Sequence, residues 1–352
     1  MLRRALNKQK RTIIEEIRGE FFVSAKARGH DDEKIAEGLV TGFAGYAFCK
    51  AHSTAYGVEA YQSAWLKHNY PAEFMAAVLS NGKGFYDPLV YVLESYRLGL
   101  HFLPPMVNEP GPKFTVHGNA IRVPLTRTKG LADRTIQRLL AERARGPFAS
   151  LADFHRRVKP LPEEMEAMIR AGGFDEFGQT RTQQFWEAQY LHRTFGGNRE
   201  PGQGWLLPPP SLERFPGVPL REPTRRERLE AETESFGYAV SEHPLELFAD
   251  VAWDTYCTVA RLGEHVGQTV VTCGLVVEQR THHQITGEPM KFLTLADWTG
   301  MVETELFAQT YKSYGLATVR YPVLEVTATV EPFENGRGFS LRVWRADKPR
   351  TR

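Results

Sequence analysis

Residues 41–56 read TGFAGYAFCKAHSTAY and combine two glycines with several aromatic side chains, a lysine and a histidine. Glycine permits tight turns and close backbone approach, and Ser53 is of a residue type that often caps helices. The segment therefore predicts a loop that leads into a helix, with Lys50 and His52 beside the helix start. The positive end of a helix dipole favours phosphate there. The alternative is an ordinary turn between buried helices, with both side chains merely at the surface.

A helix is expected directly after this loop. Val58, Tyr61 and Trp65 recur at helical spacing, and Pro71 is expected to end that helix and begin the next. Residues 43–56, together with the run AYQSAWLKHNYPAEFMAA at 60–77, resemble the fingers domain of the bacterial DNA polymerase III alpha subunits, the C-family DNA polymerases. This sequence departs from the family pattern at three positions, where a glycine, an asparagine and a serine are replaced by Ala47, Cys49 and Ala51. Such departures suit a divergent or error-prone member.

The basic amino-terminal segment carries part of the same resemblance. Residues 1–11, MLRRALNKQKR, are similar to a family segment that presents cations to the incoming nucleoside triphosphate. Arginine suits this role because its forked donors bind phosphate bidentately and remain charged. The resemblance implies a nucleotide-binding set of Arg3, Arg4, Lys8, Lys50 and His52. A solvated basic helix is the alternative interpretation.

Composition limits the class of protein. A length of 352 residues predicts two or three domains, and a net charge of +2 requires any nucleic-acid surface to be local. Cys49, Cys257 and Cys273 have no metal-binding spacing and indicate reduced thiols in a cytoplasmic protein. No apolar run reaches membrane length, so we expect no membrane partner. We also expect no metal or cofactor bound by this chain.

The expected fold is a multidomain α+β protein. Its parts are a helical fingers segment at 1–105, a helix-hairpin-helix region at 106–195, a Gly/Pro-rich linker at 196–223, and a helical connector with an OB-fold β-barrel at 224–352, the barrel covering about 256–345.

The helix-hairpin-helix expectation rests on the run TKGLAD at 128–133. It follows a short predicted strand at 121–125 and precedes a helix expected to end near Ala144. Hairpins of this family donate backbone N–H groups to phosphate oxygens without reading bases. The resemblance implies DNA contact by Lys129 and Gly130, whereas Ala132 replaces the second glycine of the family pattern. A degenerate hairpin retained for packing is the alternative.

The linker contains the run QGWLL at 203–207. Apolar side chains on an exposed linker prefer burial, and short peptides can insert such anchors into a partner's pocket. The resembling family carries a sliding-clamp-binding peptide in the same interval. This implies clamp contact by Gln203, Trp205, Leu206 and Leu207. Alternatively, the tryptophan and leucines fold back on their own domain.

From Val270 onward the hydrophobic pattern has a period of two. It predicts strands at 269–279, 290–297, 300–307, 323–331 and 338–344, with hairpin turns at 297–300 and 335–336. Five strands of this size suggest an OB-fold, and residues 292–307 resemble the OB domain of the same family. OB-folds bind single strands through aromatics and cations, which makes Arg280, Lys291 and Trp298 candidates for DNA binding, with His282 and His283 beside them. A protein–protein adaptor is the alternative. The turn at 234–245 matches the family, and we expect a structural role for His243.

The resemblance implies the C-terminal part of a DNA-directed DNA polymerase. Such enzymes extend a primer by two-metal phosphoryl transfer, with Mg²⁺ held by palm aspartates. No stretch here resembles that palm, so we expect the chain alone to be inactive. Expected partners are primed template DNA, single-stranded DNA, a deoxynucleoside triphosphate, the sliding clamp, and an N-terminal polymerase segment or other replisome subunits. The alternative is a stand-alone, non-catalytic tether that binds DNA and clamp.

Overall fold

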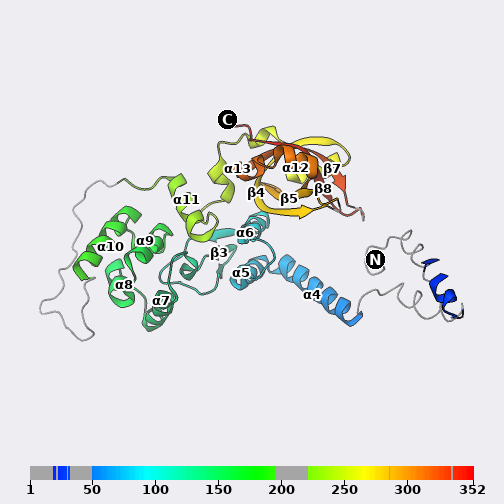
Figure 1. Cartoon of the computed structure of the whole chain (residues 1–352). Helices are drawn as coiled ribbons and strands as arrows, with labels where there is room; N and C mark the ends of the chain where they lie inside the picture. Colours follow the sequence, from blue (N-terminus) through cyan, green and yellow to red (C-terminus); the bar gives the residue numbers. More distant parts are fainter. Residues whose placement is uncertain are drawn as a thin grey trace. The chain divides into compact units, whose positions relative to one another are not determined.

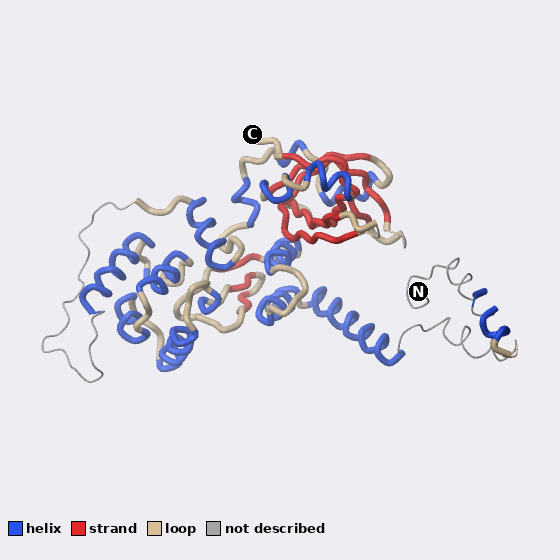
Figure 2. Tube along the Cα trace, in the orientation of Figure 1, coloured by secondary structure: helices blue, strands red, loops and turns tan. Residues whose placement is uncertain are grey.

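A computed structural model describes residues 19–20, 23–29, 31, 50–195, 221–284, 286–333 and 336–352 (Figures 1 and 2). The chain divides into two compact units, Met1–Asn69 and Tyr70–Arg352, and each is described by itself. The predicted nucleotide-binding residues Arg3, Arg4 and Lys8 lie outside the described residues. So does the predicted clamp peptide with Gln203, Trp205, Leu206 and Leu207.

Helix α4 (Lys50–Asn69) is the main described element of the first unit. It already includes Lys50, three residues before Ser53, so the prediction that Ser53 caps this helix is wrong. Lys50 and His52 likewise lie in the first turn of the helix and not on a preceding loop. The alanines at 51 and 55 are strong helix formers, which explains why the helix extends upstream of the serine.

The second unit begins with two helices and a small sheet. These are α5 (Pro71–Asn81), α6 (Pro88–Arg97), β1 (His101–Leu103), β2 (Thr115–His117) and β3 (Ala120–Arg122), with strand order β1-β3-β2. Pro71 occupies the start of α5, as predicted. The Asp87 side chain caps α6 by accepting a hydrogen bond from the backbone N–H of Leu89 at 2.8 Å. Met75 and Val92 pack with Ile121 in one core, which orients these helices on the sheet.

A cluster of helices follows. Its elements are η2 (Leu125–Arg127), α7 (Asp133–Arg145), α8 (Leu151–Val158), α9 (Pro162–Arg170), η3 (Asp175–Phe177) and α10 (Arg181–Phe195). The helix predicted to end near Ala144 is therefore confirmed as α7. Buried Phe154 lies between Phe148 and Phe174, with ring centroids 5.1 and 4.9 Å away in edge-to-face geometry. These aromatic contacts join the loop before α8 to the turn after α9.

A connector of short helices leads to the last domain. It comprises α11 (Arg225–Phe236), η4 (Pro244–Phe248), η5 (Trp253–Thr255) and η6 (Val259–His265). Thr224 and Glu227 form a reciprocal capping box at the start of α11, and Gly237 ends that helix in the left-handed conformation. Tyr238 and Val240 then pack into the core shared with α5 and β3. The connector is thus anchored to the first part of this unit.

The last domain is a closed five-stranded barrel with strand order β4-β5-β6-β8-β7. Its elements are β4 (Thr269–His283), β5 (Pro289–Asp297), β6 (Gly300–Leu306), α12 (Ala308–Tyr314), α13 (Ala317–Arg320), β7 (Val323–Pro332) and β8 (Phe339–Asp347). All five predicted strands are confirmed, with β4 and β8 longer than predicted, and the α+β fold class with an OB-like barrel is confirmed. A parallel pairing of β6 with β8 closes the barrel.

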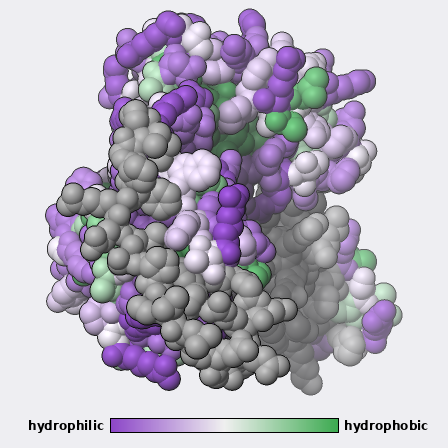
Figure 3. Space-filling model, turned by 90° about the vertical axis from the view of Figure 1, so that its left-hand side faces the viewer, coloured by the Kyte–Doolittle hydropathy of each residue, from purple (hydrophilic) through white to green (hydrophobic). Residues whose placement is uncertain are grey.

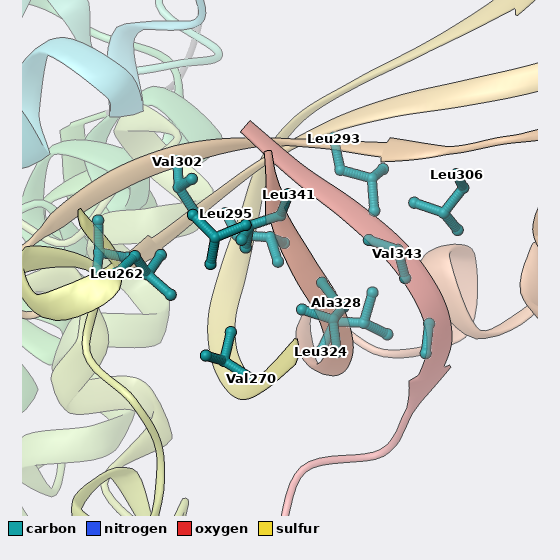
Figure 4. Packing of buried hydrophobic residues seen from close by; sticks show 14 residues of the cluster. Leu262, Val270, Leu293, Leu295, Val302, Leu306, Leu324, Ala328, Leu341 and Val343 are labelled. Atoms are coloured by element: carbon teal, nitrogen blue, oxygen red, sulfur yellow. The ribbon is translucent and has the colours of Figure 1, made fainter. Parts of the chain in front are cut away.

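The period-two pattern explains the barrel interior. Leu293 and Leu295 of β5 and Leu341 and Val343 of β8 point into one apolar core (Figure 4). The side chains between them face outward. Asp297 closes the predicted β5–β6 turn by accepting hydrogen bonds from the N–H groups of Thr299 and Gly300 at 2.7 and 3.0 Å. Among the described residues, no helix is long and apolar enough to cross a membrane.

Candidate nucleic-acid interface

Hydrophilic side chains cover most of the described surface seen in Figure 3, and hydrophobic ones form only small groups. An interface must therefore be found from local geometry. Within the second unit, the sequence singles out two regions, the hairpin loop before α7 and the outer face of the barrel.

The hairpin loop exposes both predicted residues. The backbone N–H of Lys129 donates to the carbonyl of Ser235 at 3.0 Å, which ties the loop to α11, while its side chain is exposed and makes no ion pair with the described residues. Gly130 has a φ of +89°, a conformation that favours glycine, and open space surrounds it. A lysine next to an accessible turn, in which a glycine adopts positive φ, can bind a phosphate group.

Two cations that the sequence analysis missed lie near this loop. Arg127 at the end of η2 and Arg134 in the first turn of α7 are both exposed, on either side of Lys129 along the chain. One guanidinium nitrogen of Arg127 donates to the carbonyl of Ser80 at 2.6 Å, which orients that side chain. The sequence could have predicted this cluster, because Arg127 and Lys129 are two residues apart just before α7.

Buried Glu164 organises the start of α7. Its carboxylate accepts hydrogen bonds from the N–H of Ala132 at 2.9 Å, the N–H of Leu161 at 2.8 Å and the hydroxyl of Thr135 at 2.8 Å. Burial opposes ionisation, but these bonds, together with the charge of Arg134, outweigh it and lower the pKa of Glu164. The N–H of Ala132 is therefore already engaged, so a phosphate would have to approach the Lys129–Gly130 side of the loop.

On the barrel, Arg280 is exposed on the outer side of β4. Its guanidinium pairs with Glu278 at 3.1 Å and lies 4.7 Å from the centre of the Phe85 ring, which comes from the loop between α5 and α6. His282 is two residues further on the same side of β4, 6.4 Å from the ring of Phe292. His283 ends the strand and is exposed. This side of β4 thus carries the exposed cation that the sequence predicted.

Lys291 has a different environment. Only 5% of it is exposed, and its ammonium donates to the hydroxyl of Thr318 at 2.8 Å. Burial lowers the pKa of this lysine. It faces the same side of β5 as Leu293 and Leu295, so the alternation of the strand could have placed it inside. Its ammonium is directed at α13 and is not presented on the barrel surface.

Trp298 joins the barrel to the connector. It is 42% exposed, and its indole stacks on the imidazole of His243 and lies edge-on to Trp253, with ring centroids 4.6 and 6.5 Å away. Burial lowers the pKa of His243 to about 4, so its ring is neutral at pH 7, and its Nδ1 accepts the N–H of Leu245 at 3.2 Å. At least one face of Trp298 is therefore occupied within the protein.

The barrel also carries aromatic and cationic groups that the sequence analysis did not single out. Arg342 of β8 lies 4.9 Å from the ring centre of Phe307 and 4.7 Å from that of Trp344, which is 48% exposed. The alternation Leu341-Arg342-Val343-Trp344 was the available signal, because the apolar members had to face inward.

In the part of the chain that the structure describes, no group of three or more His, Cys, Asp or Glu side chains is arranged to hold a metal ion. Cys273 is buried, and burial raises the pKa of its thiol to about 12, while Cys257 is half-buried with a raised pKa from the same cause. Both are protonated, unreactive thiols at pH 7.

Comparison with known proteins agrees with this architecture. A family model described as a helix-hairpin-helix motif matches residues 99–184. The DNA polymerase III subunit alpha of Thermus aquaticus is 33% identical over 366 residues, which cover 98% of this chain and 29% of the relative. That of Deinococcus radiodurans is 32% identical, covering 88% of this chain and 25% of the relative. That of Pseudomonas aeruginosa is 30% identical, covering 100% and 33%.

A solved structure of RecG bound to a three-way DNA junction matches 57% of this chain at 17% identity with a TM-score of 0.21, too low to indicate a shared fold. The relation of this chain to known proteins therefore rests on the sequence relatives and not on the solved structure. The chain is accordingly a relative of the bacterial DNA polymerase III alpha subunits over nearly its whole length, and it spans about three tenths of theirs.

Proposed function

We propose that this chain is the DNA-handling, C-terminal part of a DNA polymerase III alpha-like DNA polymerase that acts in cytoplasmic DNA replication. The observation that carries the proposal is the similarity to alpha subunits over 98% of the chain, together with a helix-hairpin-helix match at 99–184 and a closed barrel after it. The hairpin and the barrel are both elements that commonly bind nucleic acid without base readout.

In this proposal the hairpin loop holds the DNA backbone. Lys129, Gly130 and the neighbouring Arg127 and Arg134 form an exposed cationic turn, and the ammonium of Lys129 makes no ion pair with the described residues. Such contacts position a duplex and carry no sequence information. The barrel holds single-stranded DNA, with Arg280 as the exposed cation that supports this role.

The nucleotide is gripped by the cations of the amino-terminal half, Arg3, Arg4, Lys8, Lys50 and His52. Arginine guanidinium and lysine ammonium groups bind phosphate oxygens, and a helix N-terminus also favours an anion. In a reconstituted polymerase, Arg4→Ala should raise the nucleotide concentration needed for half-maximal extension. An unchanged nucleotide dependence would count against the assignment of this segment to the fingers.

The sliding clamp is bound by the linker peptide, with Trp205, Leu206 and Leu207 as apolar anchors and Gln203 as the polar contact. Replacing Gln203 and Leu206 by alanine together should abolish capture of the chain by immobilised clamp. Retention of capture would remove this peptide from the proposal.

Primer extension requires Mg²⁺ held by palm carboxylates that we place on an N-terminal polymerase segment. When bound there, the metals would stabilise the charge of phosphoryl transfer. The decisive experiment measures primer extension by this chain alone, by an N-terminal alpha-subunit segment alone, and by the two mixed. Activity only in the mixture supports the proposal. Extension by this chain alone contradicts it, and DNA and clamp binding without any stimulation of the other segment would identify a non-catalytic tether.

A further inference from the structure

Four side chains form a row across the outer face of the barrel. Arg280 of β4 is directly opposite Phe292 of β5, Phe292 is opposite Glu305 of β6, and Glu305 is opposite Arg342 of β8. The next residue on each of the last three strands (Leu293, Thr304 and Leu341) is buried, which confirms that the row faces outward. With neighbouring strands about 4.8 Å apart, the row is about 14 Å long.

Aromatic rings extend the row at both ends. At one end, Phe85 comes from outside the barrel, is 72% exposed and packs against the guanidinium of Arg280 at 4.7 Å. At the other end, Arg342 lies over the rings of Phe307 and Trp344. The Trp344 indole N–H donates to the hydroxyl of Thr329 at 2.8 Å, which holds the ring in place. Exposed rings beside guanidinium groups, set along a continuous track, fit the bases and phosphates of a single strand.

Carboxylates interrupt this track. Arg280 is paired with Glu278 at 3.1 Å and Arg342 with Glu331 at 3.5 Å, so each cation already has an internal anionic partner. Glu305 stands between the two cations, where its carboxylate accepts a hydrogen bond from Ser340 at 3.4 Å. Burial raises the pKa of Glu305, and repulsion from Glu331 and Glu303 adds to this, while Ser340 and Arg342 act in the opposite direction.

We propose that single-stranded DNA crosses the barrel along this row. Phe85 and Trp344 stack on bases at its two ends, and the negative charge of Glu305 at its centre weakens binding. The inference rests on the single-strand binding proposed above. It adds the route of the strand across the barrel, a stacking contact from Phe85 outside the barrel, and a dependence of the affinity on the charge of Glu305. An anionic Glu305 repels the phosphate backbone of the strand. Loss of that charge allows Arg280 and Arg342 to exchange their internal partners for phosphates.

The sign of the pH effect follows from this arrangement. As pH falls, Glu305 takes up a proton, the central negative charge disappears, and single-strand binding strengthens. His282 lies on the same face of the barrel, so Glu305 is not the only ionisable side chain there. Replacing Glu305 by glutamine should therefore tighten binding at pH 8 and make its pH dependence shallower, without abolishing it.

The test measures fluorescence anisotropy of a labelled oligothymidine with the full chain at low salt, between pH 5.5 and 8.5. Phe85→Ala and Trp344→Ala should each weaken binding about fivefold or more, since a base–aromatic stack is worth about 1–3 kcal/mol. Trp186→Ala is the matched control, because that tryptophan is 47% exposed but lies on α10. Glu166→Gln, on α9, is the charge control for Glu305→Gln. Unchanged thermal unfolding midpoints exclude misfolding.

The outcomes separate this inference from the function on which it rests. If wild-type chain binds oligothymidine but Phe85→Ala and Trp344→Ala bind as tightly as Trp186→Ala, the path is wrong. If Glu305→Gln has the affinity and pH dependence of Glu166→Gln, the charge of Glu305 does not weaken single-strand binding and that part of the inference is wrong. Absence of wild-type binding over the whole pH range would overturn the proposed single-strand function itself, together with the path.

Discussion

The imidazole of His243 stacks on the indole of Trp298, with 4.6 Å between their ring centroids and 25° between their planes. The histidine caps η4 of the connector, and the tryptophan occupies the β5–β6 turn of the barrel. The ring of Tyr96 of α6 also lies against this imidazole, with centroids 4.7 Å apart and a tilted geometry. One ring pair therefore links the barrel to the connector and, through Tyr96, to the helices that precede the hairpin region.

Trp298→Ala should lower the free energy of unfolding by about 1–2 kcal/mol, because it removes the stack on His243 and part of the barrel–connector contact. Urea unfolding of the purified chain measures this. Trp344→Ala serves as the control, since that ring lies on the outer barrel face beside Arg342 and Thr329. If Trp298→Ala leaves stability unchanged and selectively weakens single-strand binding, the ring is a DNA contact and not a structural link.

Lys291→Met should leave the free energy of unfolding unchanged or raise it by up to about 1 kcal/mol. The substitution removes a buried charge whose described hydrogen-bond partner is a neutral hydroxyl, and methionine fills a similar volume. Oligonucleotide binding should stay the same, because the ammonium is directed at Thr318 inside the protein. Arg280→Met is the comparison on the outer face and should weaken binding. A loss of affinity in Lys291→Met equal to that in Arg280→Met would show that the lysine reaches the strand.

Glu164→Gln should lower stability by about 2–4 kcal/mol at neutral pH, because a charged acceptor of three hydrogen bonds becomes a neutral amide. The lowered pKa of Glu164 means that the folded state favours the carboxylate. Its contribution is present above the pKa of the unfolded chain and disappears as pH falls through the folded-state pKa. Wild type and variant should therefore converge in acid, as chemical denaturation at pH 7, 4 and 3 would reveal. Exposed Glu166→Gln is the control; a constant gap at all three pH values would disprove this linkage.

Lys129→Ala should weaken binding to duplex DNA several-fold, irrespective of sequence, and reduce the slope of log affinity against log salt by about 1. Titration of two unrelated duplexes at several salt concentrations measures both quantities. Arg226→Ala is a matched control, because this exposed arginine on α11 is paired with Glu230 at 2.9 Å. Equal salt slopes for Lys129→Ala, Arg226→Ala and wild type would exclude the hairpin lysine from the phosphate contact.

The hydrophobic pattern was enough to predict the barrel strands, because a sheet with one buried face imposes a period of two on the residues themselves. The start of α6 is also encoded locally, because the Asp87 side chain caps the helix and Pro88 occupies its first position. Ser53 shows the limit of such local signals, because a residue that often begins helices lies inside α4 when strong helix formers upstream of it are also helical.

The candidate sites divide in the same way. The sequence by itself determined the order of helical, hairpin and barrel regions, the family resemblance, and the exposed turn with Lys129 and Gly130, because each depends on residues that are close along the chain. Only the tertiary structure decided that Lys291 is buried against Thr318, that Trp298 stacks on His243, and that Phe85 meets Arg280. These contacts join residues far apart in sequence, and their geometry depends on how the barrel closes and how the connector and the α5–α6 loop pack against it.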